Sequence, residues 1–253
     1  MPHHTAMHFW EVTAMVTMQT LLSLVLFSAA IGLLVFIARQ PLRRYKPYDL
    51  AVFKFLGRFV SPGKNRFMLF VTFLGKHQFL VPANILLIAY FIFIRHQNWF
   101  SIRVLTIALS SLVLMLLLKL LFQRKRPLSP LLKAARGLSF PSGHAIMSVT
   151  FYGLLLYIVL RQTNVLWLRM TAIIFLVVLI FLIGYSRVYL RVHYASDVIA
   201  GFIIGVLWLM ISLFVLNRVE AYATPEVVIL KHPGQPAQAL LQTLIGMRHY
   251  LMM

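Results

Sequence analysis

The sequence predicts an all-α integral membrane protein with six transmembrane helices. Three observations lead to this fold class. Hydrophobic residues make up 61% of the 253 residues and charged residues only 11%, whereas soluble domains carry roughly 25% charged residues. The apolar residues gather in runs that approach the length of about 20 residues needed to cross a bilayer. The charges, 24 Lys or Arg against 5 Asp or Glu, gather mainly between those runs.

The same composition excludes several other classes of protein. Intrinsic disorder requires low hydrophobicity, and the absence of Cys excludes disulfide frameworks, thiolate metal sites and Cys nucleophiles. A net charge of +19 also occurs in nucleic-acid-binding domains, but apolar runs of membrane length do not. We therefore expect the basic loops to face anionic lipid or a phosphorylated substrate. We expect no nucleic-acid partner, and no obligate protein partner is evident.

Six apolar stretches are expected to span the membrane within one membrane domain, residues 1–253. The first carries no charge, is too long for the apolar core of a signal peptide and follows no Lys or Arg, so we expect it to be retained. The last two are joined by only about nine residues, which makes them antiparallel neighbours. Pro and Gly interrupt the tail, residues 217–253. The stretches cover residues 12–38, 79–94, 102–122, 144–160, 166–185 and 194–216.

A basic connector, residues 39–76, follows the first span and holds nine Lys or Arg but a single acid, Asp49. Apolar residues recur in it at helical spacing, at Val52, Phe53, Leu56, Phe59 and Val60. This pattern predicts a helix in the membrane interface that ends at Pro62-Gly63. A solvated basic loop is the alternative.

Charged and polar residues at the ends of apolar spans are costly and usually functional. Here they gather at residues 119–127, 140–144 and 186–197. The third span leaves the membrane on the side where the fourth enters, and the fifth leaves where the sixth enters. Topology alone therefore brings the three clusters to one side of the membrane.

The residue types in these clusters suit a phosphate group. Lys119, Arg126 and Arg187 supply three cations. A guanidinium group can bind two phosphoryl oxygens at once, and a Lys ammonium group adds a compact positive charge. A helix is expected to begin near Ser142 and Gly143, where free backbone N–H groups attract anions. Gly143 allows a close approach of the backbone, and Ser142 adds a hydroxyl donor.

Two histidines remain for catalysis. His193 and Asp197 are four residues apart, so they share a helix face if the sixth span begins this early. A carboxylate on one ring nitrogen fixes the tautomer and leaves the other nitrogen free to attack. His144 comes from another element and is placed to protonate the leaving oxygen.

Taken singly, each feature has an ordinary structural explanation. Lys119 can snorkel, the basic run 124–126 can set topology, Pro-Ser-Gly is common in turns, and a His-x3-Asp pair often makes a structural hydrogen bond. The joint pattern favours function. The string from Ser186 to Asp197 fixes four residue types, and its chance occurrence in such a chain is on the order of one in a thousand.

The tripartite signature of the type 2 phosphatidic acid phosphatase superfamily is similar to three strings in this chain, Lys119-x6-Arg126-Pro127, Pro141-Ser142-Gly143-His144 and Ser186-Arg187-x5-His193-x3-Asp197. Every fixed position is matched, in order. The signature covers residues 119–197, and the six-span layout extends the resemblance to most of the chain. These motifs are highly specific for the superfamily but do not separate its substrates.

The resemblance implies a phosphatase that uses neither a metal nor another cofactor. His193 would match the nucleophile that forms a phosphohistidine, Asp197 the residue that orients it, and His144 the acid that protonates the leaving group and then helps to activate water. The phosphate cradle would comprise Lys119, Arg126, Ser142, Gly143 and Arg187. Soluble vanadate haloperoxidases share the signature, but six spans argue against them.

The leading hypothesis is an integral-membrane enzyme that removes the terminal phosphate of a lipid phosphate or diphosphate. Candidate substrates are undecaprenyl diphosphate, phosphatidylglycerol phosphate, phosphatidic acid and lipid A phosphate. One alternative is a lipid phosphotransferase that uses the same intermediate. Another is a non-catalytic lipid-binding or transport protein, against which the presence of both histidines and the aspartate argues.

Two indications of membrane orientation conflict. The resemblance implies a bacterial inner-membrane protein with its site on the periplasmic or outer face. However, 17 of the 24 Lys and Arg lie on the expected catalytic side, which the positive-inside rule places in the cytoplasm. We expect the outer face, because basic residues near such a site also attract anionic lipid.

Overall fold

Helices make up nearly all of the regular structure in the part of the chain that the computed structural model describes, residues 32, 46–127, 131 and 137–231. Five of them are long and apolar enough to cross a membrane, His77–Ile94, Asn98–Phe122, Gly143–Gln162, Leu166–Tyr189 and Ala195–Ala221. They coincide with five of the six expected spans. The other expected span, residues 12–38, lies outside the described residues except for Gly32, and so does the tail beyond residue 231.

The first described span consists of α4 (His77–Ala89) and a short π-helical segment, η1 (Tyr90–Ile94). The other spans are α5 (Asn98–Phe122), α6 (Gly143–Gln162), α7 (Leu166–Tyr189) and α8 (Ala195–Lys231). Several extend past the apolar runs that predict them, because a charged residue can continue a helix. Arg187, for example, lies in the last turn of α7.

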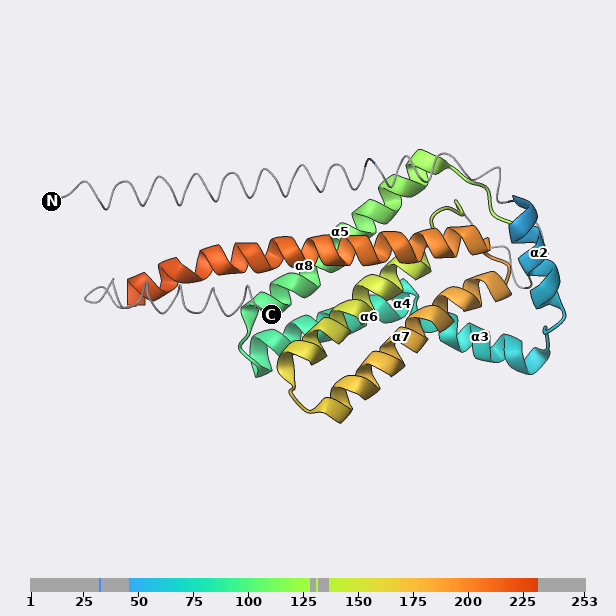
Figure 1. Cartoon of the computed structure of the whole chain (residues 1–253). Coiled ribbons are helices and arrows are strands. Elements are labelled where there is room, and N and C mark those ends of the chain that lie inside the picture. The colour runs from blue at the N-terminus through green and yellow to red at the C-terminus, as the bar shows by residue number, and fades with distance from the viewer. Residues whose placement is uncertain (1–31, 33–45, 128–130, 132–136, 232–253) are drawn as a thin grey trace.

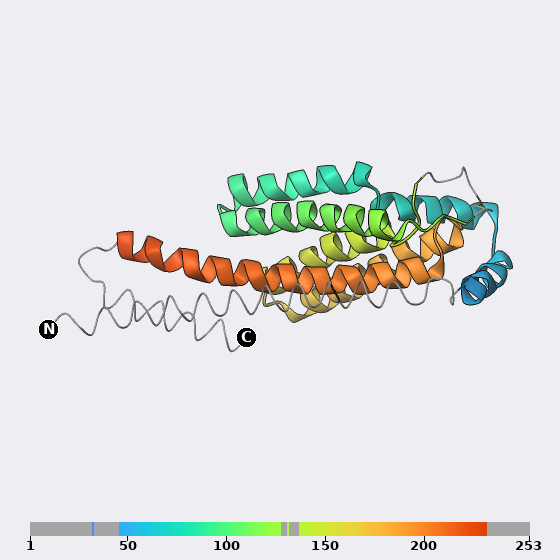
Figure 2. The same cartoon turned by 90° about the horizontal axis from the view of Figure 1, so that it is seen from above.

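The central helix of the bundle is α6, which packs against α5, α7 and α8 (Figures 1 and 2). Two glycines of α8 bring its backbone close to α6. A Cβ atom on Gly201 would lie 2.9 Å from the carbonyl oxygen of Ser142, and one on Gly205 would lie 3.2 Å from that of Ile146. Small residues allow such close approach between membrane helices. The start of α8 is thereby held against the start of α6, where the Ser142 N–H donates to the Asp197 carbonyl oxygen at 3.0 Å.

Large apolar side chains cover the outside of the bundle. Soluble monomers rarely expose contiguous apolar surface on this scale. A protein surface that contacts lipid tails, in contrast, must be apolar. Exposed side chains of this kind occur on α4, α5, α7 and α8, and include Leu86, Leu109, Leu116, Phe175, Phe181 and Met210. The outer surface therefore agrees with a membrane-embedded protein.

Two further helices, α2 (Lys46–Gly57) and α3 (Pro62–Leu74), lie at one end of the bundle (Figure 1). The connector contains a helix at the expected place, α2, but the expected end at Pro62-Gly63 was wrong, because α2 ends at Gly57 and a second helix follows. Pro62 instead begins α3, a position where proline is favoured because its missing N–H would have no helical partner. The Ser61 side chain caps this helix by accepting from the Lys64 N–H at 3.4 Å.

Only one face of α2 is packed. Phe53 and Leu56 are buried in a cluster with Ala145, Val188 and Val198, which come from α6, α7 and α8. Other large side chains of α2 are exposed, at Tyr48, Leu50 and Phe55. The inner face of α2 thus rests on the three helices whose ends carry the signature residues.

Candidate active site

The structure brings together the three polar clusters at the end of the bundle that α2 and α3 cover. Lys119 comes from the last turn of α5 and Arg126 from the segment after it, Ser142 and Gly143 begin α6, and Arg187 is in the last turn of α7. All eight residues expected to form the site lie in this region. Five of them line one cavity, namely Lys119, Arg126, Gly143, His144 and His193. Ser142, Arg187 and Asp197 are buried beside it.

The expected shared helix face of His193 and Asp197 was wrong. Because α8 begins at Ala195, His193 lies in the loop before the helix. The Asp197 carboxylate turns back and accepts from the Tyr194 N–H at 3.0 Å, as acidic side chains do in the first turn of a helix. This geometry still places Asp197 Oδ2 3.6 Å from His193 Nδ1.

His193 is held as a neutral imidazole. Its side chain is 1% exposed, and this burial lowers its pKa to about 4, helped by the cationic Arg126 and Arg187 and opposed by Asp197. Nδ1 faces the aspartate, and Nε2 lies 3.3 Å from Nη1 of Arg126. One ring nitrogen of an unprotonated histidine therefore faces the cation cluster.

The cations are fixed by backbone and hydroxyl partners rather than by acids. Lys119 Nζ donates to the Leu138 carbonyl oxygen at 3.1 Å. Arg126 donates to the carbonyl oxygens of Gly137 at 3.2 Å and Val192 at 2.8 Å. Because neutral acceptors leave the positive charge uncompensated, these side chains can still attract an anion.

Arg187 is anchored from a helix outside the signature. Its Nη1 donates to Thr72 Oγ1 on α3 at 2.5 Å. No local sequence pattern points to Thr72, because 115 residues separate the pair. The structure thus makes α3 part of the support of the site.

Several buried polar atoms in the site have no partner. Among the described residues five buried side-chain atoms make no hydrogen bond, although one of them, His193 Nδ1, faces Asp197 Oδ2 at 3.6 Å. Four belong to expected site residues, Ser142 Oγ, His144 Nε2, Arg187 Nε and His193 Nδ1. Buried polar atoms are almost always hydrogen-bonded. A ligand with several acceptor oxygens would satisfy the donors among them, and a phosphoryl group has this chemistry.

A second layer of partners fixes Asp197, and the sequence interpretation missed it. The fully buried carboxylate accepts from Ser139 Oγ and pairs with Arg124 Nη1. Arg124 had an ordinary explanation as part of a topogenic charge run. The one available sequence signal was Asp49, the single acid of the basic connector, whose Oδ2 lies 2.9 Å from Arg124 Nη2.

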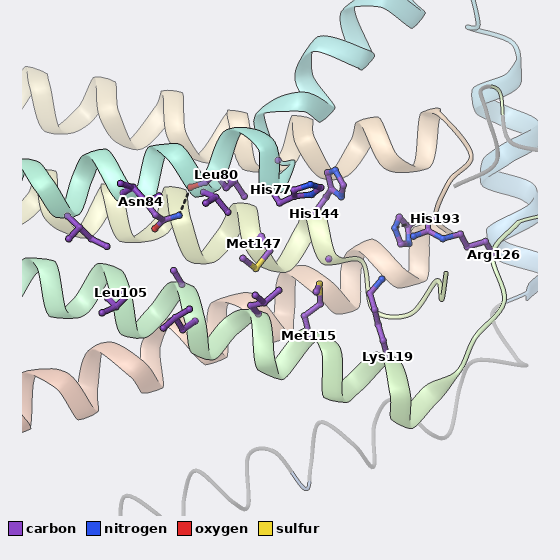
Figure 3. A pocket seen from close by; sticks show the side chains of 18 residues that line it. His77, Leu80, Asn84, Leu105, Met115, Lys119, Arg126, His144, Met147 and His193 are labelled. Atoms are coloured by element: carbon purple, nitrogen blue, oxygen red, sulfur yellow. Dashed lines mark hydrogen bonds between the residues drawn. The ribbon is translucent and has the colours of Figure 1, made fainter. Parts of the chain in front are cut away.

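A cavity of about 480 Å³ extends from the site between α4, α5 and α6 (Figure 3). His144, His193 and Lys119 lie around its polar end. The rest is lined mainly by apolar side chains, such as Leu80, Ile85, Leu105, Leu109, Leu112 and Met147. One cavity therefore joins an end that carries Lys119 and Arg126 to an apolar region between the transmembrane helices.

Comparisons with known proteins agree with this geometry. Residues 100–220 match the PAP2 superfamily. Phosphatidylglycerophosphatase B of Bacillus subtilis (strain 168) is 33% identical over 150 residues, which cover 58% of this chain and 72% of that protein.

Two solved structures are similar in fold. The crystal structure of the first transmembrane PAP2 type phosphatidylglycerolphosphate phosphatase from Bacillus subtilis has a TM-score of 0.67 and 26% identity, covering 76% of this chain and 96% of the other. Aquifex aeolicus LpxE has a TM-score of 0.52 and 28% identity, covering 65% and 93%. The family match covers nearly all of α5 and all of α6 and α7, together with most of α8, and these helices carry the polar clusters. Together with the relative and the two similar folds, it shows that the chain belongs to the PAP2 superfamily as a membrane-embedded lipid phosphatase.

Proposed function

We propose that this protein removes the terminal phosphate of a lipid phosphate through a phosphohistidine intermediate at His193. The observation that carries the proposal is the neutral, buried His193 between Asp197 and a cluster of uncompensated cations. A neutral imidazole has the lone pair needed for attack on phosphorus. The cations stabilise the negative charge that spreads over the phosphoryl oxygens in the transition state.

In the first step, His193 Nε2 bonds to phosphorus as the bond from phosphorus to the lipid oxygen breaks. His144 gives its proton to that oxygen, and the lipid leaves as an alcohol or a monophosphate. In the second step, water attacks phosphorus while His144 takes a proton from it. The phosphorus–nitrogen bond breaks, which releases inorganic phosphate and restores neutral His193.

Each remaining residue of the site has a role in this scheme. Asp197 fixes the ring orientation of His193 through Nδ1. The cradle would hold the phosphoryl oxygens with the unpartnered donors Ser142 Oγ and Arg187 Nε, with the backbone at Gly143, and with Lys119 and Arg126. No metal takes part, because the histidine supplies the nucleophile.

The apolar channel supports a lipid as the substrate. It continues from the polar end between α4 and α5, so a head group at His193 would leave its chains among apolar side chains. Phosphatidylglycerol phosphate is the first substrate to test, because the related Bacillus subtilis protein is named phosphatidylglycerophosphatase B. Undecaprenyl diphosphate, phosphatidic acid and lipid A phosphate follow.

We further propose a single membrane domain of six spans, with residues 12–38 as the first and α2 in the membrane interface. The exposed Tyr48, Leu50 and Phe55 on α2 support contact with lipid. The polar end of the bundle would face the periplasm of a bacterial inner membrane. The basic residues around that end would then gather anionic lipid.

Phosphate release from a panel of these four lipids tests the proposal. The purified protein is assayed without an acceptor lipid, so that release reports hydrolysis rather than transfer. We expect turnover of at least one lipid, and loss of turnover in His193→Ala. His96→Asn is the matched control. His96 is exposed and follows η1, at the end of that span farther from the proposed site, and Asn tolerates its positive φ of 52°.

The outcomes separate the alternatives. Binding of a lipid phosphate without turnover would favour a lipid-binding or transport protein. Phosphoryl transfer that requires an acceptor lipid would favour a phosphotransferase. Wild-type release of phosphate by His193→Ala on every lipid would contradict the proposed intermediate.

A further inference from the structure

A hydrogen-bonded network connects α2 to Asp197 through Arg124 and Ser196, which occupy variable positions within the signature strings. Its outer member is Asp49, whose side chain is 2% exposed although it lies on a helix at the edge of the molecule. Asp49 Oδ2 accepts from Arg124 Nη2 at 2.9 Å and from Ser196 Oγ at 2.7 Å. Asp49 Oδ1 accepts from the Ser196 backbone N–H at 3.0 Å. Both carboxylate oxygens are therefore fixed.

Arg124 is the bridge between the two carboxylates. Its Nη1 pairs with Asp197 Oδ1 and donates to Ser196 Oγ at 2.8 Å. The guanidinium also lies 4.1 Å from the centre of the Tyr194 ring, within the range of a cation–π contact. A planar guanidinium with donors on separate edges suits two carboxylates at once, which a Lys ammonium does not.

Asp49 also fixes the start of α8. The Ser196 N–H is one of the N-terminal helix groups that have no partner within the helix, and Asp49 supplies both an acceptor and a negative charge near that end. Ser196 directly precedes Asp197. Asp49 therefore acts on the catalytic aspartate by two routes, through Arg124 on one side and through the first turn of α8 on the other.

Removal of the Asp49 carboxylate would leave the Arg124 charge and the Ser196 donors without their acceptor, next to Asp197. Arg124 Nη2 would lose its carboxylate, and the N–H and hydroxyl of Ser196 would lose their acceptor. Buried donors without partners rearrange or cost free energy. Arg124 would be free to turn further toward Asp197 or away from it, and either movement changes the contact of Asp197 with His193.

On this geometry, and resting on the phosphatase reaction proposed above, we propose that Asp49 is a positioning residue for catalysis. It holds Arg124 and the start of α8 so that Asp197 keeps His193 oriented for attack. Its hydrogen bonds and ion pair among the described residues go to Arg124 and Ser196 and not to the proposed cradle residues. Its removal should therefore lower kcat and leave KM nearly unchanged.

The test is a kinetic comparison of full-length Asp49→Asn with the wild type, in detergent or vesicles, on a lipid phosphate that the wild type hydrolyses. We expect kcat to fall about 10- to 100-fold, which corresponds to the free energy of one charge-assisted hydrogen bond whose loss misplaces Asp197 and His193. KM should change by less than about threefold, because uniform binding is untouched. Unchanged kcat, or a rise in KM alone, would overturn the proposal.

A double-mutant cycle with Arg124→Gln tests whether Asp49 acts through Arg124. If it does, the double variant loses little more kcat than Arg124→Gln alone, because coupled residues are not additive. Fully multiplicative losses would overturn the proposal. Ser196→Ala removes one hydroxyl from the same network and is the substitute variant if Asp49→Asn does not accumulate. A wild-type kcat in Ser196→Ala would then contradict the proposal.

Glu220→Gln is the matched control, because it removes an acid from another Arg–carboxylate pair. Glu220 pairs with the buried Arg103 of α5, and neither residue lines the cavity at the active site. We expect a lower thermal midpoint with kcat retained. If the wild type releases no phosphate from any lipid, the proposed function itself fails. Wild-type activity together with normal kcat in Asp49→Asn contradicts only this inference.

Discussion

At the scale of single residues, the site depends on burial combined with incomplete pairing. His193 is almost fully enclosed, and its neighbours include two Arg side chains. These conditions disfavour the imidazolium form. At neutral pH the histidine therefore carries no charge that would have to be removed before the proposed attack on phosphorus, and in that scheme Asp197 would need only to orient it.

The lowered pKa of His193 predicts a stability difference that depends on pH. The pKa of His193 is 6.5 in the unfolded chain and about 4 in the folded protein. The neutral histidine therefore contributes to the free energy of unfolding above pH 6.5, and this contribution is lost as the pH falls toward 4. Between about pH 7 and pH 4 we expect the wild type to lose about 3 kcal/mol relative to His193→Asn. Thermal midpoints of both proteins across this range measure the effect, and parallel curves would contradict the assignment.

Ser142 offers a second test at this scale, because its buried Oγ has no partner. Ser142→Ala removes a proposed phosphate donor and breaks no bond of the free protein. We expect kcat/KM to fall about 10- to 30-fold, on the order of one charge-assisted hydrogen bond, with an unchanged thermal midpoint.

Ser148→Ala is the control for that substitution. Ser148 is also buried on α6, but its Oγ donates to the Ala145 carbonyl oxygen at 3.0 Å. Its loss should leave kcat/KM at the wild-type value. Equal effects of the two substitutions on kcat/KM would count against a phosphate contact at Ser142.

At the scale of elements, the site depends on how closely α8 packs against α6. The glycines of α8 let the two backbones meet, and the meeting point lies beside Ser142 and Asp197. The donors at the start of α6 and the aspartate in the first turn of α8 are therefore set by one interface. A displacement of α8 would disturb both together.

Gly201→Ala tests this interface. The added Cβ would lie 2.8 Å from Ala145 Cβ and 2.9 Å from the Ser142 carbonyl oxygen, so the helices must separate. We expect a destabilisation of about 1–3 kcal/mol, as for other overpacked contacts, together with reduced kcat. Thermal unfolding and phosphate release measure the two effects.

Gly63→Ala is the matched substitution. A Cβ atom there would have no neighbour within 4 Å, so stability should stay the same or rise slightly. If Gly201→Ala behaved like Gly63→Ala in both assays, the close packing of α6 and α8 would not be needed for the site.

The helices were predictable from sequence because hydropathy and span length are local properties. The gathering of Lys119, Ser142 and His193 at one end was predictable as well, since it follows from alternating span directions. The supporting partners were not. Arg124 meets Asp49 across 75 positions, and no local pattern connects a basic run to a single acid on a connector helix. Only the tertiary packing of α2 shows that they pair.

At the scale of the whole molecule, the apolar exterior and the polar end define how the protein would sit in a bilayer. The cavity extends from the proposed site into the region between α4 and α5. A lipid could therefore place its phosphate at the polar end while its chains stay at membrane depth. This arrangement fits either orientation of the protein, because both faces of a bilayer present lipid.

Reporter fusions decide the orientation. The proposed periplasmic site puts the end of α8, at Lys231, on the cytoplasmic side. Alkaline phosphatase fused after Lys231 should then be inactive, whereas a cytoplasmic fluorescent reporter at the same position should be bright. The opposite pair of results would place the site in the cytoplasm, in agreement with the distribution of Lys and Arg.

In the proposed reaction, His193 carries the phosphoryl group during turnover. The most direct measurement mixes purified protein with a lipid phosphate that is radiolabelled on its terminal phosphate, stops the reaction in alkali, in which phosphohistidine is stable, and measures label on the protein. We predict transient labelling of the wild type and of His96→Asn, and neither labelling nor phosphate release in His193→Ala. Labelling of His193→Ala at wild-type levels, with normal phosphate release, would contradict the account.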